Sequence, residues 1–238
     1  MENVNIYNKV RERFWGRNME INSKEIKENA RLSLKGNWKV AILSSLVYSI
    51  VSIIGDFTTE SGSIWFSVLT TISSALFMFG YTAIMLHIVR GEDAEFSQIF
   101  VECKRFWKGL GMTIVVDIYI GLWTLLLVVP GIIASIKYSM TFYIWVDNPQ
   151  IGIEDAINKS IEMTEGHKMD IFKSYLSFIG WIVLTLVPGL LVGFWFRQYA
   201  VGIMSLGMIF VSPYIEVSMG TFYNMLVNER ESQLTLEE

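Results

Sequence analysis

Long apolar stretches are the feature that most constrains the fold of this 238-residue chain. The hydrocarbon core of a bilayer is about 30 Å thick and an α-helix rises 1.5 Å per residue, so about 20 apolar residues cross it. Six stretches approach this length. We therefore predict an all-α, polytopic membrane protein with about six transmembrane helices, at about residues 38–55, 64–89, 111–129, 131–146, 171–187 and 200–226.

Composition supports lipid as the second solvent of this chain. Apolar residues make up 52% of it, aromatic residues 14% and charged residues 18%, with a mean hydropathy of +0.41. An ordinary soluble domain carries more charge than this. The net charge of -4 gives no electrostatic basis for binding nucleic acid, so we exclude that function class. The one cysteine, Cys103, cannot close an intrachain disulfide.

Proline and arginine fix the outer boundaries of the later spans. Val129-Pro130-Gly131 predicts the turn between the third and fourth spans, and Pro188-Gly189 predicts the end of the fifth. A sixth span beginning at Leu190 would place Arg197 deep in the bilayer, at a cost of at least about 2.5–3.5 kcal/mol. We therefore place its start near Ala200, which leaves 188–199 as an outer interfacial segment.

The basic residues predict the orientation. Seventeen of the 19 lysines and arginines lie in residues 1–39, 90–108 and 147–173 and at Arg230, which share one side of the membrane if six passes are made. Positive residues favour the cytoplasmic side, so both termini are expected there, in the cell membrane. We expect a cytoplasmic extension at 1–22, one transmembrane domain at 23–226 and a cytoplasmic tail at 227–238. Membrane lipids are thus the first expected partners.

Amphipathic segments before the span pairs suggest an internal repeat. One begins at Asn22-Ser23-Lys24-Glu25 and ends at Gly36, a second begins at Asp93 and ends at Gly109, and a third begins at Glu154-Asp155 and ends at Gly166. The triplets Thr141-Phe142-Tyr143 and Thr221-Phe222-Tyr223 recur in two of the following hairpins. These patterns indicate three divergent copies of an amphipathic helix followed by a helical hairpin.

Several short motifs, taken in order, resemble a bacterial integral-membrane family known as domain of unknown function 975. The resemblance covers about residues 23–226, whereas residues 1–22 resemble an added segment and the stretch between Trp181 and Pro213 is longer than usual. It implies a multi-pass bacterial membrane protein and supplies no reaction and no catalytic residue. The motifs are Lys35-Gly36-Asn37-Trp38, Tyr138-Ser139-Met140, Tyr143-Ile144, Asp147-Asn148-Pro149, Ala156-Ile157, Ser160, Gly166-His167-Lys168, Leu176 to Trp181, Pro213-Tyr214 and Phe222-Tyr223.

Signatures of soluble enzymes are not present in the sequence. Gly109-Leu110-Gly111 lacks the following Lys-Ser/Thr of a phosphate-binding loop, and neither His-Glu-x-x-His nor Gly-x-Ser-x-Gly occurs. An ATP-driven role would thus require a separate ATPase subunit. Gly166 should break the helix that would align Glu162 and Glu165 with His167, so we expect no metal site and no cofactor. We expect a non-enzymatic protein. An intramembrane enzyme is the third alternative, after the two non-enzymatic classes of function described below.

Ionisable residues within the apolar spans are the best candidates for a functional site, because such residues are costly in a membrane. We predict that Asp117, Lys137 and Glu216 form a polar interior completed by tyrosines at positions 119, 138, 143 and 214. The alternative is that the three charged residues act separately, with Lys137 and Asp117 reaching the membrane boundaries and Glu216 bonded to a tyrosine. The tyrosines are Tyr119, Tyr138, Tyr143 and Tyr214.

Two classes of function remain open. The first is a membrane protein that handles a small solute, a lipid or a hydrophobic peptide through its polar interior. The second is a membrane-organising or accessory subunit that recruits a protein partner through interfacial helices. An aromatic stripe supplies the candidate contact for that partner, or for lipid. It consists of Phe96, Phe100, Phe106 and Trp107.

Overall fold

A computed structural model describes residues 22–60, 64–195 and 197–237, although some helical side chains in these ranges, including that of Phe106, lie outside the description. The predicted extension at 1–22 lies outside the described residues except for Asn22. No strand occurs in the described part, so the all-α prediction is confirmed there. The helices are α2 (Ser23–Leu34), α3 (Trp38–Glu60), α4 (Ile64–Arg90), η1 (Phe96–Arg105), α5 (Phe106–Leu126), α6 (Val128–Tyr138), α7 (Thr141–Asp147), α8 (Ile153–Thr164), α9 (Lys168–Leu176), α10 (Ile179–Trp195) and α11 (Arg197–Glu237).

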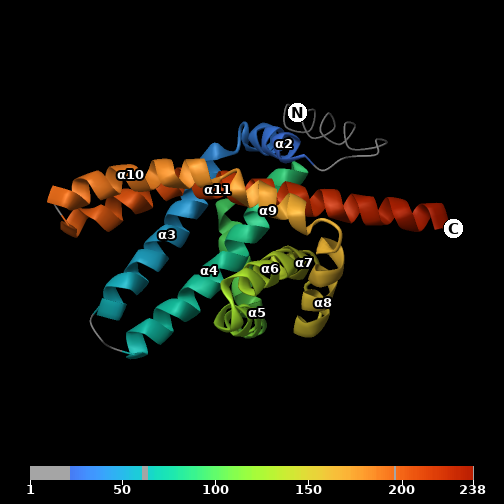
Figure 1. Ribbon diagram of the computed structural model, residues 1–238, viewed down its shortest axis with the longest axis horizontal. Helices are drawn as coiled ribbons and strands as arrows, with labels where there is room; N and C mark the ends of the chain where they lie inside the picture. The colour runs from blue at the N-terminus through green and yellow to red at the C-terminus, as the bar shows by residue number, and fades with distance from the viewer. Residues whose placement is uncertain (1–21, 61–63, 196, 238) are drawn as a thin grey trace.

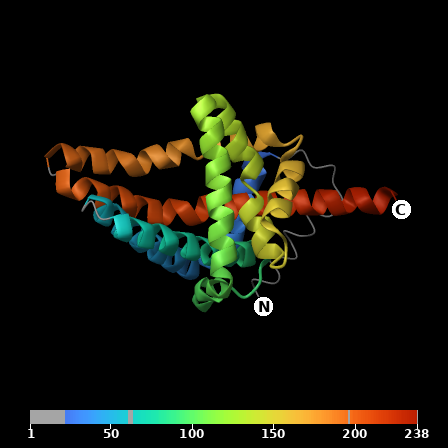
Figure 2. The ribbon, with the colours of Figure 1, turned by 90° about the horizontal axis from the view of Figure 1, so that it is seen from below.

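Three helical hairpins extend outward from a common centre. They are α3–α4, α5–α6 and α10–α11, and the two helices of each contact one another. Figures 1 and 2 show α3–α4 and α10–α11 extending toward one end of the molecule, while α5 runs across them. The hairpins meet at the centre and separate toward their tips. Each hairpin therefore leaves much of its apolar surface exposed.

Two of the three predicted amphipathic helices form as expected. Asn22 caps α2, because its side-chain oxygen accepts a hydrogen bond from the Lys24 N–H at 3.0 Å. Gly36 follows α2 with φ 99°, and Gly166 follows α8 with φ 84°. A positive φ is unfavourable for residues with a Cβ, so glycine at both positions lets the chain turn sharply into the next helix.

The middle amphipathic segment differs from the prediction. Residues Phe96–Arg105 form a 3₁₀ helix that leads directly into α5, and Gly109 lies inside α5 instead of ending a helix. The glycine is needed for packing, since a Cβ at this position would lie 2.6 Å from the ring of Phe79. The Phe79 ring is itself held against Trp145, with a centroid distance of 4.6 Å.

Each amphipathic segment packs on a hairpin other than the one that follows it in sequence, and two of them also contact the hairpin that follows. η1 contacts α3 and α4 and also α5, α8 contacts α5, α6 and α7, and α2 contacts α9 and α11 and also α4. The η1 backbone comes so close that a Cβ on Gly80 of α4 would lie 2.2 Å from the Ile99 carbonyl oxygen. The apolar faces of α2 and α8 are therefore buried within this molecule.

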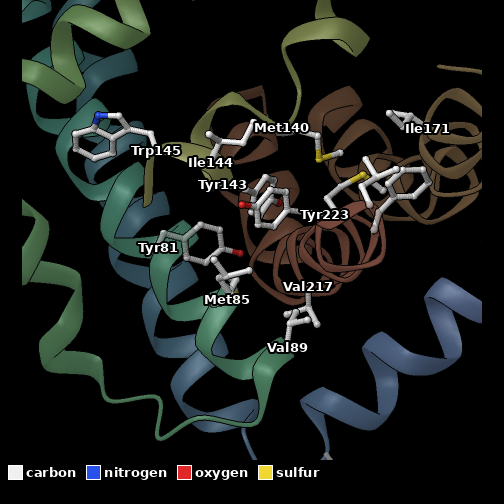
Figure 3. Close-up of a cluster of buried hydrophobic side chains, with 14 of the residues drawn as sticks. Tyr81, Met85, Val89, Met140, Tyr143, Ile144, Trp145, Ile171, Val217 and Tyr223 are labelled. Carbon is white, nitrogen blue, oxygen red and sulfur yellow. The ribbon is translucent and has the colours of Figure 1, made fainter. Parts of the chain in front are cut away.

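The hydrophobic core lies where the hairpins meet. It includes the fully buried side chains of Trp145, Phe178, Phe222 and Tyr223, which come from α7, α11 and the α9–α10 link. Figure 3 shows Tyr81, Met85 and Val89 of α4 facing Tyr143 of α7 and Val217 and Tyr223 of α11. The core is thus built from the ends of the hairpins nearest the amphipathic helices.

Three described helical stretches are long and apolar enough to cross a membrane. They are Ile72–Arg90, Trp107–Leu126 and Lys168–Val192, and Trp38–Ile50 forms a shorter apolar helix. The hairpin tips are strongly exposed, with Leu125 at 85% and Leu191 at 67% of full exposure. The three long stretches and the shorter Trp38–Ile50 helix contain parts of four of the six predicted spans.

The remaining boundaries differ from the predicted spans. The predicted fourth span is divided into α6 and α7 at Ser139-Met140, and the turn before it falls at Leu127, ahead of Pro130. The fifth does not end at Pro188, because α10 continues to Trp195. The start of α11 at Arg197 lies close to the predicted start near Ala200, and α11 runs through the predicted tail without interruption to Glu237.

Two glycines of α5 provide a matched test of this packing. We expect Gly109→Ala to destabilise the protein by about 1–3 kcal/mol, because its Cβ would overpack the Phe79 ring. Gly121→Ala meets no atom within 4 Å and should be neutral or stabilising, since alanine favours helices. Thermal unfolding followed by circular dichroism in detergent measures both. Equal melting temperatures for the two variants would contradict the described contact between α4 and α5.

Candidate functional site

A carboxylate on α11 hydrogen-bonds a tyrosine on α7 at the centre of the molecule. The Tyr143 hydroxyl donates to Glu216 Oε2 at 2.6 Å and lies 3.3 Å from the Glu216 carbonyl oxygen. Tyr143 is buried and Glu216 is partly buried. The short distance is typical of a hydrogen bond from a hydroxyl to a carboxylate. This contact joins α7, the short helix after the second hairpin, to α11 of the third.

A second group of hydroxyls extends from the same face of α11. Ser212 lies four residues before Glu216, so both side chains project from one face of the helix. The Tyr81 hydroxyl donates to Ser212 Oγ at 3.5 Å, and Ser45 Oγ donates to the Tyr81 hydroxyl at 3.1 Å. Tyr81 comes from α4 and Ser45 from α3. Together with Glu216 and Tyr143, these residues form what we call the hydroxyl cluster, which brings together the α3–α4 hairpin, α7 and α11.

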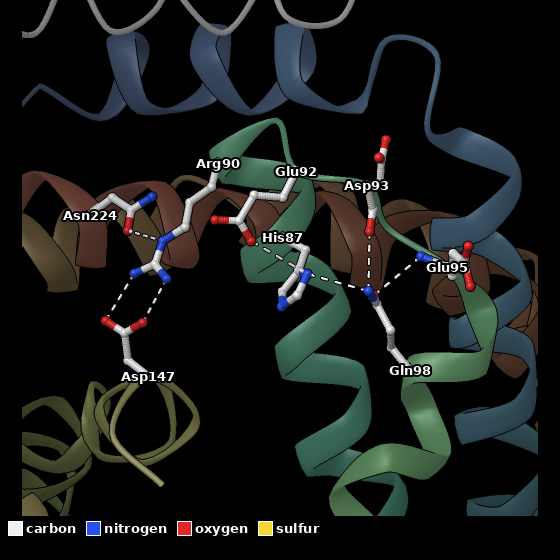
Figure 4. A network of polar contacts seen from close by, with 8 residues as sticks. All are labelled: His87, Arg90, Glu92, Asp93, Glu95, Gln98, Asp147 and Asn224. Atoms are coloured by element: carbon white, nitrogen blue, oxygen red, sulfur yellow. Dashed lines mark hydrogen bonds and ion pairs between the residues drawn. The ribbon is translucent and has the colours of Figure 1, made fainter.

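An ion pair lies next to the hydroxyl cluster at the ends of the hairpins. Arg90 of α4 donates two hydrogen bonds to Asp147 of α7, at 2.6 and 2.9 Å, and its Nε donates to Asn224 of α11 at 3.3 Å. The Tyr223 hydroxyl donates to Asp147 at 2.9 Å. Figure 4 shows the paired guanidinium and carboxylate groups between α4, α7 and α11. We call these four residues the Arg90 junction.

The two repeated triplets meet between the cluster and the junction. The rings of Tyr143 and Tyr223 stack with a centroid distance of 5.6 Å and an interplanar angle of 21°. Figure 3 shows the two rings side by side. Tyr143 bonds Glu216 and Tyr223 bonds Asp147, so equivalent tyrosines of the two triplets serve adjacent carboxylates. The sequence repeat thus corresponds to a direct contact in the structure.

Opposing effects set the charge state of Asp147. Burial acts to raise the pKa of its carboxyl group, but the hydrogen bonds and positive charge of Arg90, with the Tyr223 hydroxyl, outweigh burial. The resulting pKa lies below the ordinary value. Asp147 is therefore ionised at neutral pH, and its pairing with Arg90 stabilises the folded state.

The structure does not join the three charged residues predicted to form one interior. No ion pair links Asp117, Lys137 and Glu216 within the described part of the chain. Asp117 is exposed on α5, and Lys137 is half-buried near the end of α6. The Lys137 backbone carbonyl accepts a hydrogen bond from Ser160 Oγ at 2.7 Å, which satisfies a helix-end acceptor. Glu216 instead bonds Tyr143, as the alternative reading expected.

The other predicted tyrosines lie in two separate places. Tyr119 and Tyr138 face each other across α5 and α6 with a centroid distance of 6.0 Å, and Tyr119 is exposed. Tyr214 packs edge-to-face on Phe178, and its hydroxyl donates to the Lys27 carbonyl at 3.4 Å. It therefore attaches α2 to α11. Of the four predicted tyrosines, Tyr143 is the one with a hydrogen bond to Glu216.

The predicted aromatic stripe is divided between packing and exposure. Phe96 and Phe100 contact each other edge-to-face, and Phe100 also contacts Phe77 of α4. Phe100 nevertheless remains 52% exposed and Trp107 80% exposed. The Phe106 side chain lies outside the described residues. No group of three or more His, Cys, Asp or Glu side chains suited to a metal ion occurs in the described part of the chain.

Sequence reasoning did not identify the Arg90 junction as a site. Asp147 and Tyr223 did appear among the motifs of the family resemblance, but their spacing of 76 residues gave no sign that they touch. Arg90 was counted only as a basic residue at a span boundary. The recurrence of Thr-Phe-Tyr was the available signal, because repeated units often place equivalent residues around a shared centre.

Comparison with known proteins finds one family match. The family model described as Protein of unknown function (DUF975) matches residues 19–134 and 124–230. No curated protein and no solved structure matches the chain. The matched residues include the hydroxyl cluster and the Arg90 junction.

The lowered pKa of Asp147 predicts how stability depends on pH. The ion pair stabilises the folded state above the unfolded-state pKa of about 3.9, and this stabilisation is lost as the pH falls through the lower folded-state pKa. Asp147→Asn should cost about 1–3 kcal/mol at pH 7, by removing a charged hydrogen-bond partner of Arg90. Chemical unfolding in detergent from pH 7 to pH 3 measures this. The variant should lose less stability on acidification than the wild type does.

Asp93→Asn provides the control, because Asp93 is exposed and its carboxylate makes no ion pair among the described residues. This variant should retain the wild-type stability and pH profile. Equal effects of the two substitutions would contradict a stabilising role for the Arg90 junction.

Proposed function

We propose that this chain, which belongs to the DUF975 family of proteins of unknown function, is a non-enzymatic multi-pass membrane protein that handles a small solute, a lipid or a hydrophobic peptide. Six passes would result if all three hairpins enter the bilayer from the side of their joined ends. The exposed apolar tips support this, since Leu125, Leu191 and Trp65 would otherwise face water. The excess of basic residues on the joined side favours a cytoplasmic location for both termini in the cell membrane.

The likeness between the first and third units of the predicted repeat supports the same arrangement. Helices α2 and α8 bury residues at matching intervals, Ile26, Ala30 and Leu34 in one and Ala156, Ser160 and Thr164 in the other. Each is followed two residues later by a glycine with positive φ. Each amphipathic segment also packs on the hairpin of another unit. In lipid, hairpins have little hydrophobic reason to associate, so these exchanged helices would hold the units together at the membrane surface.

The hydroxyl cluster is the observation that carries the functional proposal. It places Glu216 and the hydroxyls of Tyr143, Tyr81, Ser45 and Ser212 among otherwise apolar hairpins. Polar groups at membrane depth are costly, and in membrane proteins they mark ligand and ion pathways. Hydroxyls both donate and accept hydrogen bonds, so the cluster suits a ligand with polar groups. The chain would bind such a ligand between the hairpins.

A second candidate function rests on a different surface. Phe100 and Trp107 remain exposed at the junction of η1 and α5, although the neighbouring segment is packed on α4. An accessory subunit would use these rings to contact a protein partner, or a separate ATPase subunit if transport is energised. The faces of α2 and α8 are less suited to recruitment, because they are already buried within the chain.

Native mass spectrometry tests the principal proposal. Protein released from mild detergent should retain a small-molecule or lipid adduct, and Glu216→Gln should reduce its occupancy by about tenfold, equivalent to about 1.4 kcal/mol, through loss of the carboxyl group as a hydrogen-bond partner. Asp117→Asn is the matched control, because this exposed carboxylate lies within an apolar helix but outside the hydroxyl cluster. Equal occupancy in all three proteins would contradict a ligand site at the cluster.

A further inference from the structure

Glu216, the carboxyl group of the hydroxyl cluster, has no basic partner among the residues that the structure describes. No lysine, arginine or histidine in the described part forms an ion pair with Glu216, and its hydrogen-bond partner is the Tyr143 hydroxyl. The Glu216 side chain lies on a helix that the proposed six-pass topology places in the bilayer. An ionised carboxylate without a counter-charge is expensive in such surroundings. Either a proton or another cation must therefore offset its charge.

Among the described residues, the titratable groups near Glu216 are tyrosines. Tyr143 on α7 and Tyr81 on α4 lie close to it, and Tyr175 on α9 is near enough for the carboxylate charge to act on it. None of these groups is cationic. A protonated, neutral Glu216 would therefore be surrounded by neutral tyrosines, so no neighbouring charge would be left without a partner.

The basic residues on adjacent elements are directed elsewhere. On α2, Lys27 donates to the Ser177 carbonyl and lies over the Phe178 ring, and Arg31 lies over the Tyr214 ring. On α4, Arg90 donates to Asp147. Lys137 on α6 makes no ion pair with Glu216 in the described part. No described basic side chain is thus positioned to neutralise the Glu216 carboxylate, and the hydrogen bond donated by the Tyr143 hydroxyl is the one described interaction that favours its ionised form.

We infer that Glu216 is a proton-binding site, which holds a proton at neutral pH and exchanges it through the adjoining hydroxyls. This inference rests on the membrane location given under the proposed function. A protonated Glu216 can donate as well as accept, and the hydroxyls of Tyr143, Ser212, Tyr81 and Ser45 can each do the same. The hydroxyl cluster then offers exchangeable donors and acceptors in two hydrogen-bonded sets, Tyr143–Glu216 and Ser45–Tyr81–Ser212, which lie one helical turn apart on α11.

The geometry also restricts the ligand. A protonated carboxyl group among hydroxyls offers no fixed positive charge to an anion. A neutral hydrogen-bonding molecule can bind without displacing the proton, whereas a cation would bind only by releasing it. The Glu216 proton would thereby couple the binding of a cationic ligand to proton release.

Infrared spectroscopy of the full chain in nanodiscs tests the inference without any solute. A protonated carboxyl group has a C=O stretching band distinct from that of a carboxylate. We expect one such band to persist at pH 7, well above the ordinary glutamate pKa of about 4.3. Glu216→Gln should abolish this band and Asp117→Asn should leave it in place. Exchange into D₂O should shift it to lower wavenumber if the proton exchanges with solvent.

A second variant keeps the test independent of folding defects. Tyr143→Phe should move the band to higher wavenumber by removing the hydrogen bond donated to Glu216. Loss of the band at the pH where exposed carboxyls ionise, its survival in Glu216→Gln, or failure to shift in D₂O would overturn the inference. So would its disappearance when sodium chloride replaces choline chloride at constant pH, because a metal cation would then hold the site.

The outcome is separable from that of the proposed function. The band reports protonation whether or not a ligand binds. An intact band together with no ligand adduct would overturn the proposed function alone, and a missing band with a Glu216-dependent adduct would overturn this inference alone.

Discussion

The contact among the ends of α4, α7 and α11 holds this structure together. In the proposed membrane location, apolar hairpins would gain little from burying apolar surface against one another, so close packing and polar contacts would specify their arrangement. The Arg90–Asp147 pair and the stacked Tyr143 and Tyr223 rings supply such contacts from three separate helices. The amphipathic helices extend this centre by packing on hairpins of other units. The tips depend on these joined ends for their placement.

The need to compensate polar groups among apolar hairpins also explains why the Arg90 junction and the hydroxyl cluster occupy different positions. The Arg90 junction lies at the hairpin ends, where water can reach the Arg90 and Asp147 side chains, which are 25% and 23% exposed. The hydroxyl cluster lies nearer the start of α11, at Ser212 and Glu216. It contains one carboxylate without a basic partner in the described part. A paired charge suits a structural role because both partners are compensated. The uncompensated carboxylate suits exchange of a proton or ligand, which is why we assign function to Glu216.

Sequence reasoning reached the helical class, the family and most helix positions, because apolar stretches, caps and glycines are local signals. Gly36 and Gly166 were identified correctly since a helix end requires a positive φ there. Gly109 was misread because its role depends on Phe79, which is distant in sequence. The Ser139-Met140 break was missed because Ser160, also distant in sequence, satisfies the Lys137 carbonyl. For the site, Glu216 was found as an unusual charge, but its neighbours depend on how the hairpins pack.

The central claim is that three hairpins cross the bilayer from one side, with their joined ends in the cytoplasm. Cysteine accessibility in intact cells tests it most directly, using a membrane-impermeant maleimide. Native Cys103 should react only after the inner face is exposed, whereas Ser61→Cys in a Cys103→Ser background should react in intact cells. Reaction of Cys103 in intact cells, with protection of the cysteine at position 61, would contradict the account.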